Sequence, residues 1–345
     1  MSWQLLPARD FSRYRHTWDR LNATGPNSAL LHPDFIEPLL QILAQGDERL
    51  AIYGDVTDPQ VMALLTRRRF GIWETFQPSQ LPLGPWLNQA TLPLEQLLQQ
   101  LSRALPGPVL SLSITQQDPD FYPRPEHSAC LNTLDYIVTA RISVNDRFED
   151  YWSQRGKNLR QNLNRQRNRL QREQVSVRLE SITDPAEVAA AIHSYGELES
   201  IGWKAEEGTA IHSDNAQGLF YTLLLENFCR RGMGRIYQYW YEDKLVASDL
   251  CIQQDGVLII LKTTYDETLT TSSPAMLMRR DYFEAIFNEG AIHTIEFYGP
   301  VMEWHRRLSE DMRALYHINF HRWPVLEKIR RYCQKFWKPS RDKQA

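Results

Sequence analysis

Apolar and polar positions alternate along this chain in two successive sets of strand-like and helix-like segments. In the first 145 residues, this pattern predicts helices over 11–21, 33–43 and 93–105, and strands over 49–53, 61–66, 70–76, 109–114 and 134–142. The second set comprises a long helix over 146–174, a strand over 175–181, helices over 185–200 and 215–231, and a hairpin over 235–253. It ends with a strand over 257–265, a helix that opens at 272–277, and a strand over 292–298. A last strand over 312–318 and a closing helix over 324–337 complete the prediction.

The second set follows the order strand, two helices, three strands, helix, strand, and the first set shows a blurred version of that order. A chain of 345 residues exceeds the usual size of a single hydrophobic core. We therefore predict an α/β (α+β) fold with two domains, residues 1–145 and 146–340. Each domain is expected to be a mixed, mostly antiparallel sheet flanked by helices.

The most informative segment is the strand–loop–helix unit between Val257 and Tyr298. Ser273 is a favourable N-cap residue, and Pro274 suits the first helical position because its missing N–H would have no partner there. The unpaired N–H groups and the dipole of such a helix terminus can hold a phosphate group. Many strand–loop–helix units look alike and bind nothing, so this segment alone leaves both interpretations open.

Composition excludes several classes of protein. The hydrophobic fraction of 42% and the net charge of −3 are typical of a globular protein and give no general attraction to DNA. The four cysteines lie far apart without a Cys-x-x-Cys pair, so the sequence predicts neither a metal site nor a disulfide framework. We find no apolar run of about 20 residues and no signal-like start, and we therefore expect a cytoplasmic protein.

The second half resembles the acetyltransferase domain of CelD/BcsL-type proteins, which belong to the GNAT superfamily and are related to the FemAB-like transferases. The resemblance covers about residues 146–310 and lies in the order and spacing of several short pieces. These pieces are the basic helix 157–170, Glu199-Ser-Ile-Gly-Trp-Lys204, Gly208-Thr-Ala-Ile211, Ala247-Ser-Asp-Leu250, Lys262-Thr-Thr-Tyr-Asp-Glu267, Ser273-Pro-Ala275, Ile295-Glu-Phe-Tyr-Gly299 and Glu303-Trp-His-Arg-Arg307.

The chain also departs from the family pattern at several positions. Ala275 stands where the family usually has Gly, and Thr270 and Ser273 replace the basic or Gln residue and the first Gly of the phosphate loop. Trp304 and His305 stand where the family tends to a Tyr-Lys pair. Residues 1–145 resemble the N-terminal half of such proteins, which implies a tandem arrangement of two GNAT-like domains.

The resemblance implies an acyltransferase that uses acetyl-CoA or another acyl-CoA as co-substrate and needs no metal. In GNAT folds, the central strand separates from its neighbour and pairs with the pantetheine arm; here that strand is 257–263, separating from 292–298. The residues implied to bind the cofactor are Leu261, Lys262, Thr263, Ser272, Ser273, Ala275, Met276 and Leu277.

An amine with a pKa near ~10 must lose a proton before it attacks a thioester, so the reaction needs a base. The candidates near the strand ends are Glu199, Asp249, Glu296 and His305, and Tyr298 could protonate the leaving thiolate. Each has an ordinary alternative. His305 could be a surface residue beside two arginines, the carboxylates could be half exposed or buried with a raised pKa, and most tyrosines are packing residues.

Several further residues could contact a substrate. Trp203 and Lys204 could grip an acidic or sugar acceptor, with Tyr265 beside them, although a Trp next to a Gly is also an ordinary core residue. Seven basic residues and no acid lie between Arg155 and Arg172. This helix, which includes Arg160, is either a solvated face or an anion-binding wall for CoA, tRNA or a polyanion.

We therefore predict a GNAT-family N-acyltransferase that moves an acetyl or acyl group to a small-molecule or sugar amine, in polysaccharide or cell-envelope metabolism by association. One alternative is a FemAB-like, aminoacyl-tRNA-dependent peptidyltransferase, for which tRNA would be the partner. Another is a degenerate GNAT that binds a ligand without catalysis. The basic closing helix 328–338 either contacts a membrane surface or packs on the domain.

Overall fold

A computed structural model describes residues 1–201, 211–212, 214–269 and 271–326 of the chain. The contacts within the chain define two compact units. Unit 1 comprises residues 1–33, 44–137 and 314 onward, and unit 2 comprises residues 34–43 and 138–313. The domain boundary at residue 145 was predicted from the order of the elements along the sequence, and it stays a prediction.

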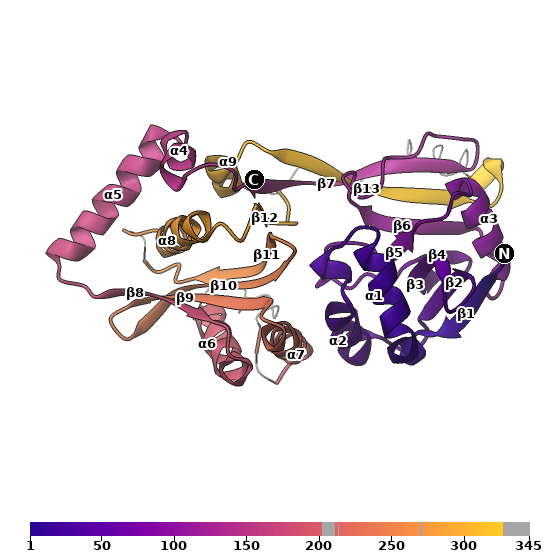
Figure 1. The fold of residues 1–345 in the computed structure, drawn as a ribbon, viewed down its shortest axis with the longest axis horizontal. Helices are drawn as coiled ribbons and strands as arrows, with labels where there is room; N and C mark the ends of the chain where they lie inside the picture. The colour runs from indigo at the N-terminus through magenta and orange to yellow at the C-terminus, as the bar shows by residue number, and fades with distance from the viewer. Residues whose placement is uncertain (202–210, 213, 270, 327–345) are drawn as a thin grey trace. The chain divides into compact units, whose positions relative to one another are not determined.

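Unit 1 is a sheet with the order β1-β2-β3-β4-β6-β13, flanked by helices (Figure 1). Its core is a cluster of apolar side chains, which includes Trp86, Leu101 and Ile114. The elements are β1 (Trp3–Pro7), the 3-10 helices η1 (Ala8–Tyr14) and η2 (Ala29–Leu31), α1 (Arg15–Ala23), β2 (Arg49–Gly54), β3 (Pro59–Arg69), β4 (Ile72–Thr75), β5 (Trp86–Asn88), α3 (Leu94–Ala104), β6 (Ser111–Gln117) and β13 (Met312–His321).

Unit 2 is a sheet with the order β7-β12-β11-β10-β9-β8 (Figure 1). Helix α8 packs on one face of the central strands, whereas α6 and α7 cover the other face. The elements are α2 (Pro33–Leu43), β7 (Leu131–Ser143), α4 (Phe148–Ser153), α5 (Lys157–Arg172), β8 (Val177–Ile182), η3 (Pro185–Glu187), α6 (Val188–Ile201), α7 (Ala216–Arg230), β9 (Gly234–Tyr241), β10 (Lys244–Gln254), β11 (Val257–Tyr265), α8 (Pro274–Glu289), β12 (Thr294–Glu296) and α9 (Glu303–Leu308).

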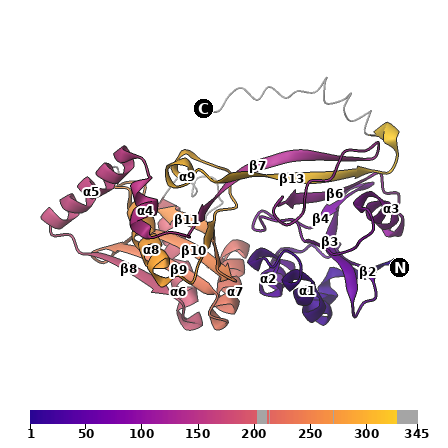
Figure 2. The ribbon, with the colours of Figure 1, turned by 45° about the horizontal axis from the view of Figure 1, so that its top comes forward.

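The sheet of each unit is completed by a strand from the other half of the sequence. In unit 2, β12 pairs antiparallel with β7 through the register Glu296↔Arg141 and Thr294↔Ser143. In unit 1, β6 pairs antiparallel with β13, with His321 opposite Ser111. Figure 2 shows how β7, in magenta, and β13, in yellow, run beside each other. Strand pairing between distant parts of a sequence leaves no local pattern, and the sequence did not predict it.

A gap between the parallel strands of unit 1 is filled by the unit's own chain. Strands β4 and β6 pair only from Ile72 to Glu74, and the segment before β5 then approaches β6. A Cβ atom on Gly84 would lie 2.1 Å from the carbonyl oxygen of Thr115, so only glycine allows this approach. The Gln117 side chain donates hydrogen bonds to the carbonyls of Gly84 and Thr115. This part of unit 1 is closed by polypeptide.

Most predicted elements are present, two expectations need correction, and one is only partly described. The helix predicted over 146–174 is two helices, α4 and α5, because Gly156 adopts an extended conformation (ψ 133°) as the N-cap of α5. The strand predicted over 292–298 is only three residues long, and Tyr298 adopts a positive φ of 48° just after it. The closing helix predicted from Pro324 begins as expected, but from 327 onward it lies outside the described residues.

No helix within the described ranges combines the length and the apolar character that a bilayer crossing requires.

Candidate active site

The site begins where two parallel strands of unit 2 separate. Strand β11 pairs with β12 only at Val257↔Thr294, Leu258↔Ile295 and Ile259↔Glu296. On its other edge, β11 carries a bulge against β10, because Leu250 lies opposite Lys262 and Cys251 opposite Ile260, which leaves Leu261 without a partner in the register. A bulge bends a strand and increases its local twist. It therefore accompanies the divergence of β11 from β12.

A cavity of about 400 Å³ lies at this divergence. Because the sheet is open here, helices from its two faces line the same space, α6 from one face and α8 from the other. A volume of this size is sufficient for a substrate group. The lining residues are Leu198, Glu199, Thr263, Thr264, Tyr265, Glu267, Ser272, Ser273, Ala275, Met276, Arg279, Met302 and Trp304.

The N-terminus of α8 lies at the edge of this cavity. Ser273 is the N-cap and Pro274 the first helical residue, as expected, but the Ser273 side chain makes no capping hydrogen bond. The Ser273 N–H donates instead to Oε1 of Gln166, at 2.8 Å. Proline has no N–H, and the Ala275 N–H has no hydrogen-bond partner among the described residues. The expectation of several unpaired amides is thus reduced to one.

The basic helix α5 lies against the loop that precedes α8. Besides the bond from Ser273 to Gln166, Nη2 of Arg169 donates to Oγ1 of Thr271 at 2.9 Å. The Arg169 guanidinium therefore lies beside Thr271, two residues before the N-cap of α8. Arg160 lies elsewhere on α5, where its Nε donates to the carbonyl of Arg155 at 3.0 Å, and it does not line the cavity.

Arg279, which lines the cavity, belongs to a buried ion pair. Arg279 of α8 binds Asp249 of β10 through two hydrogen bonds, with Nε–Oδ2 at 3.0 Å and Nη2–Oδ1 at 3.1 Å. Nη2 also donates to Oγ1 of Thr263 at 2.6 Å, and the Tyr282 hydroxyl donates to Asp249 at 2.8 Å. Asp249 is fully buried and Arg279 is 2% exposed. Burial acts to lower the pKa of Arg279, but Asp249 outweighs it and raises that pKa. The guanidinium is therefore a permanent cation.

Trp304 and His305 stack beside this ion pair. The Arg279 guanidinium lies 4.1 Å from the centroid of the Trp304 ring, and the rings of Trp304 and His305 are 3.5 Å apart. Nδ1 of His305 accepts a hydrogen bond from the Met302 N–H at 2.9 Å. Burial, and then the charge of Arg279, lower the pKa of His305 to about 4. His305 is therefore a neutral structural group at pH 7, and its geometry does not favour the expected role as a base.

The lowered pKa of His305 predicts a pH-dependent stability. The unfolded chain binds a proton near pH 6.5 and the folded chain only near pH 4, so the unfolded state holds more protons between these values. The free energy of unfolding should therefore fall as the pH drops from about 6.5 to about 4, by up to about 3 kcal/mol. Urea unfolding of the wild type and of His305→Asn, whose amide oxygen can still accept the Met302 N–H, measures this effect.

The informative quantity is the stability difference between the wild type and the variant at each pH. His317, whose pKa burial also lowers, titrates in both proteins and cancels. If this difference stays constant between pH 7 and pH 4, the environment assigned to His305 is wrong.

Glu199 brings a buried carboxylate to the opposite wall of the cavity. It lies near the end of α6 and is 2% exposed, and its Oε2 accepts a hydrogen bond from the Ile211 N–H at 2.7 Å. Gly196, one turn earlier, allows the chain at Ile211 to come so close, because a Cβ atom there would lie 2.4 Å from the Ile211 carbonyl oxygen. Burial raises the pKa of the neighbouring Tyr195 and Tyr221, and the charge of Glu199 raises it further.

Two other predicted acid–base residues lie away from the cavity. Glu296 on β12 forms a buried ion pair with Arg313, with Oε1–Nη2 at 3.0 Å and Oε2–Nη1 at 3.1 Å. Tyr298 is buried, and the Arg313 guanidinium lies 5.2 Å from its ring centroid. Neither residue lines the cavity. Their contacts are those of structural groups that hold the end of β12.

The structure thus brings together part of the predicted site. The predicted residues that line the cavity are Glu199, Thr263, Tyr265, Ser272, Ser273, Ala275 and Met276. Those that do not line it are Asp249, Glu296, His305, Tyr298, Leu261, Lys262, Leu277 and Arg160. Trp203, Lys204 and Thr270 lie outside the described residues.

Sequence reasoning missed six lining residues, among them Arg279 and Trp304. Arg279 follows Ala275 by four positions on α8, and residues at this spacing share one helix face. Arg279 could therefore have been predicted as a site residue, because it lies on the same face of the helix as Ala275 at the predicted phosphate site. Trp304 was noted as a departure from the family pattern but was not placed in the site. The other four are Leu198, Thr264, Glu267 and Met302.

Within the described part of the chain, no group of three or more His, Cys, Asp or Glu side chains could hold a metal ion.

Comparison with known proteins points to the part of the chain that contains the cavity-lining residues. Residues 157–306 match the family model of the acetyltransferase (GNAT) domain. No curated protein matches the chain. Among solved structures, it is similar to the C-terminal domain of a predicted lysylphosphatidylglycerol synthetase from Agrobacterium fabrum, with 9% identity, a TM-score of 0.57, and 93% of this chain and 95% of that chain covered. A structure of FemX gives 9% identity, a TM-score of 0.56, and coverage of 95% and 100%.

A conserved protein of unknown function from Bacteroides thetaiotaomicron gives 13% identity and a TM-score of 0.56, with coverage of 92% and 99%. At such identities the likeness shows the fold alone. The family match and these folds together confirm a GNAT domain in the second half of the chain, whereas the CelD/BcsL type stays a prediction. Residues 157–306 form a GNAT-superfamily domain, and the chain has a mixed α/β GNAT acyltransferase-type fold that it shares with FemX.

Proposed function

We propose that this protein is an N-acyltransferase that moves an acetyl or other acyl group from acyl-CoA to an amine acceptor. The observation that carries the proposal is the single cavity at the divergence of β11 and β12, which joins the N-terminus of α8 to the carboxylate of Glu199. These two features suit the two halves of the reaction. A place in polysaccharide or cell-envelope metabolism, expected from the resemblance, stays a prediction.

The α8 side of the cavity suits the nucleotide thioester. Helix α8 is 16 residues long, the Ala275 N–H at its start has no partner among the described residues, and Arg169 stands beside the preceding loop. Helix N-termini attract phosphate through such N–H groups and through the helix dipole. The free edge of β11 from Ile260 to Tyr265 offers backbone groups to an extended pantetheine arm. Acyl-CoA would supply the acyl group as a thioester.

The α6 side suits the acceptor. Two carboxylates line the cavity, Glu199 within it and the exposed Glu267, whereas the charge of Arg279 is already balanced by Asp249. Such a site favours a protonated amine. Glu199 would then accept the amine proton, because a carboxylate inside the cavity can reach the group that attacks the acyl carbon. Asp249 and Arg279 would hold Thr263 and the end of β11 in place.

Calorimetric titration with CoA and acetyl-CoA tests this proposal. We expect one binding site per chain, because the comparable gap of unit 1 is filled by the segment at Gly84. Ser273→Trp, which puts a large ring at the cavity edge, should abolish binding, whereas Ser153→Trp, at an exposed position of α4, should not. Folded protein that releases no heat with either ligand would exclude an acyl-CoA donor.

A second donor is favoured by the position of α5. Its exposed basic side chains, among them Lys157, Arg165 and Arg172, lie on the helix that contacts the loop before α8, where a tRNA acceptor stem could approach. In this alternative, the acyl group comes from an aminoacyl-tRNA. Binding of tRNA would then weaken steeply with salt, and CoA would not compete.

A further inference from the structure

One end of the unit 1 sheet carries exposed aromatic and basic side chains. The register Arg69↔Ile72, Ile72↔Ser111 and Ser111↔His321 places the β3–β4 turn, the start of β6 and the end of β13 together. The backbone N–H of Arg322 also donates to the Leu110 carbonyl, and that of Leu110 to the Gly71 carbonyl. We name this region the Phe70 surface. It comprises Arg67, Arg68, Arg69, Phe70, Arg322, Trp323 and Val325.

Three large apolar side chains project from the Phe70 surface. Phe70 is 76% exposed, Trp323 49% and Val325 55%. Phe70 and Gly71 form the two-residue turn between β3 and β4, and such positions normally carry polar residues or glycine. A phenylalanine at the tip of a hairpin contributes nothing to the core of its own unit. Its exposure indicates a role in contacting something outside the chain.

The same surface is positively charged. Arg67, Arg68 and Arg69 are consecutive. Arg68 has no partner in the register with β4 and forms a bulge, which changes the direction of the side chains around it. Arg68 pairs with Glu74 at 3.3 Å, whereas Arg67 and Arg69 have no ion-pair or hydrogen-bond partner among the described residues. The Arg322 guanidinium lies 5.4 Å from the ring centroid of Trp323.

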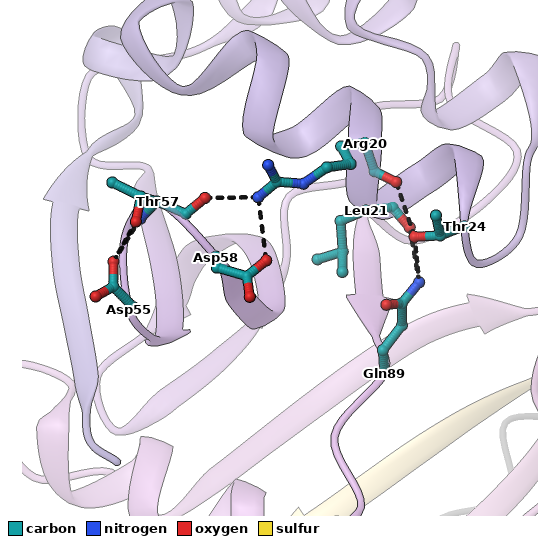
Figure 3. Close-up of polar contacts among 7 residues, drawn as sticks. All are labelled: Arg20, Leu21, Thr24, Asp55, Thr57, Asp58 and Gln89. Carbon is teal, nitrogen blue, oxygen red and sulfur yellow. Dashed lines mark hydrogen bonds and ion pairs between the residues drawn. The ribbon is translucent and has the colours of Figure 1, made fainter.

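The opposite end of the unit 1 sheet carries acidic side chains, and these have hydrogen-bond partners. There the β2–β3 turn carries Asp55 and Asp58 (Figure 3). Asp55 accepts hydrogen bonds from Thr57, and Arg20 binds both the Thr57 carbonyl and Asp58. Gln89 donates to Thr24 at 2.6 Å. The acidic residues at this end therefore have partners close by. The chain as a whole has a net charge of −3, so the positive charge of the Phe70 surface is local.

We propose that the Phe70 surface binds the surface of an anionic phospholipid bilayer. Phe70 and Trp323 enter the boundary between head groups and acyl chains, where aromatic side chains are favoured. The arginines bind lipid phosphates and keep their charged ends in water while their stems contact apolar groups. A single-stranded nucleic acid fits less well, because it needs aromatic side chains in succession along a groove.

Flotation of the full chain with vesicles tests the proposal. We expect binding to phosphatidylcholine vesicles that contain phosphatidylglycerol, and much weaker binding to phosphatidylcholine alone. The triple variant Arg67→Gln, Arg68→Gln, Arg69→Gln should lower the partition coefficient about 100-fold, because each arginine near an anionic surface contributes about fivefold. Phe70→Ser should lower it about tenfold. All replaced residues are exposed, so the thermal unfolding of the variants should match that of the wild type.

Two matched controls separate this surface from the rest of the chain. Leu219→Ser removes a 51% exposed apolar side chain from α7, and the triple variant Lys157→Gln, Arg165→Gln, Arg172→Gln removes the same number of charges from α5. Both should bind vesicles like the wild type. Equal binding of the wild type and the Phe70-surface variants, or loss of binding only in the α5 variant, would overturn the proposal. So would a Phe70-surface variant that loses affinity for an RNA oligonucleotide but keeps its affinity for vesicles.

Discussion

Replacing Glu199 by glutamine is expected to lower kcat/KM for N-acyl transfer about 100- to 10,000-fold, the range of general base catalysis. Glutamine has nearly the shape of glutamate, and its side-chain oxygen can still accept the Ile211 N–H that now binds Oε2 at 2.7 Å. The fold and the cavity should therefore persist while the proton acceptor is lost. Steady-state kinetics with an amine acceptor, over a range of pH, measure the effect.

Glu267→Gln is the matched control for this experiment. Glu267 also lines the cavity, but it is exposed at the edge. Its replacement should raise KM for a cationic acceptor and leave kcat nearly unchanged, because it removes attraction without removing the base. If Glu199→Gln keeps the kcat of the wild type, another group accepts the proton and the assignment of Glu199 fails.

Replacing Arg279 by methionine is expected to reduce the free energy of unfolding by about 3–5 kcal/mol. Methionine fills much of the same space, but Asp249 then stays buried with the Tyr282 hydroxyl as its remaining hydrogen-bond donor in the part of the chain that the structure describes. An unbalanced buried charge costs far more than the ion pair itself contributes. Urea unfolding, followed by circular dichroism, measures the loss, which is a large share of the stability of a typical protein.

The double variant Arg279→Met, Asp249→Leu distinguishes this explanation from simple loss of packing. Removal of both charges should recover most of the stability, because apolar pairs can replace buried ion pairs at little cost. It should not recover activity, since Thr263 then loses the Arg279 donor that lies 2.6 Å away. A double variant that is no more stable than Arg279→Met would show that the buried charge does not govern stability at this position.

The secondary structure was largely predictable because it depends on local patterns. The strand Val257–Tyr265 and the start of α8 at Ser273 and Pro274 were placed correctly from β-branched runs and capping preferences. The break in the helix predicted over 146–174 was missed, although Gly156 marks it. A single glycine is tolerated within many helices, so the sequence pattern alone did not require an end there.

The candidate site was predicted in its position but not in its chemistry. Seven of the predicted residues line the cavity, because they lie on the strand end, the helix start and the helix α6 that the GNAT resemblance implies. Asp249 and His305 were equally good candidates from their residue types. Only their neighbours show that Asp249 is held by Arg279 and that His305 accepts the Met302 N–H.

The sequence by itself determined the order of the elements, the two-part organisation and the helix terminus that borders the cavity, since each follows from neighbouring residues. The tertiary structure alone decided which strand completes each sheet and which side chains meet. Gln166 reaches Ser273 across 107 positions, and Glu296 on β12 lies opposite Arg141 on β7. Such contacts depend on how preformed elements dock, and docking is selected by the summed burial of many side chains rather than by any local pattern.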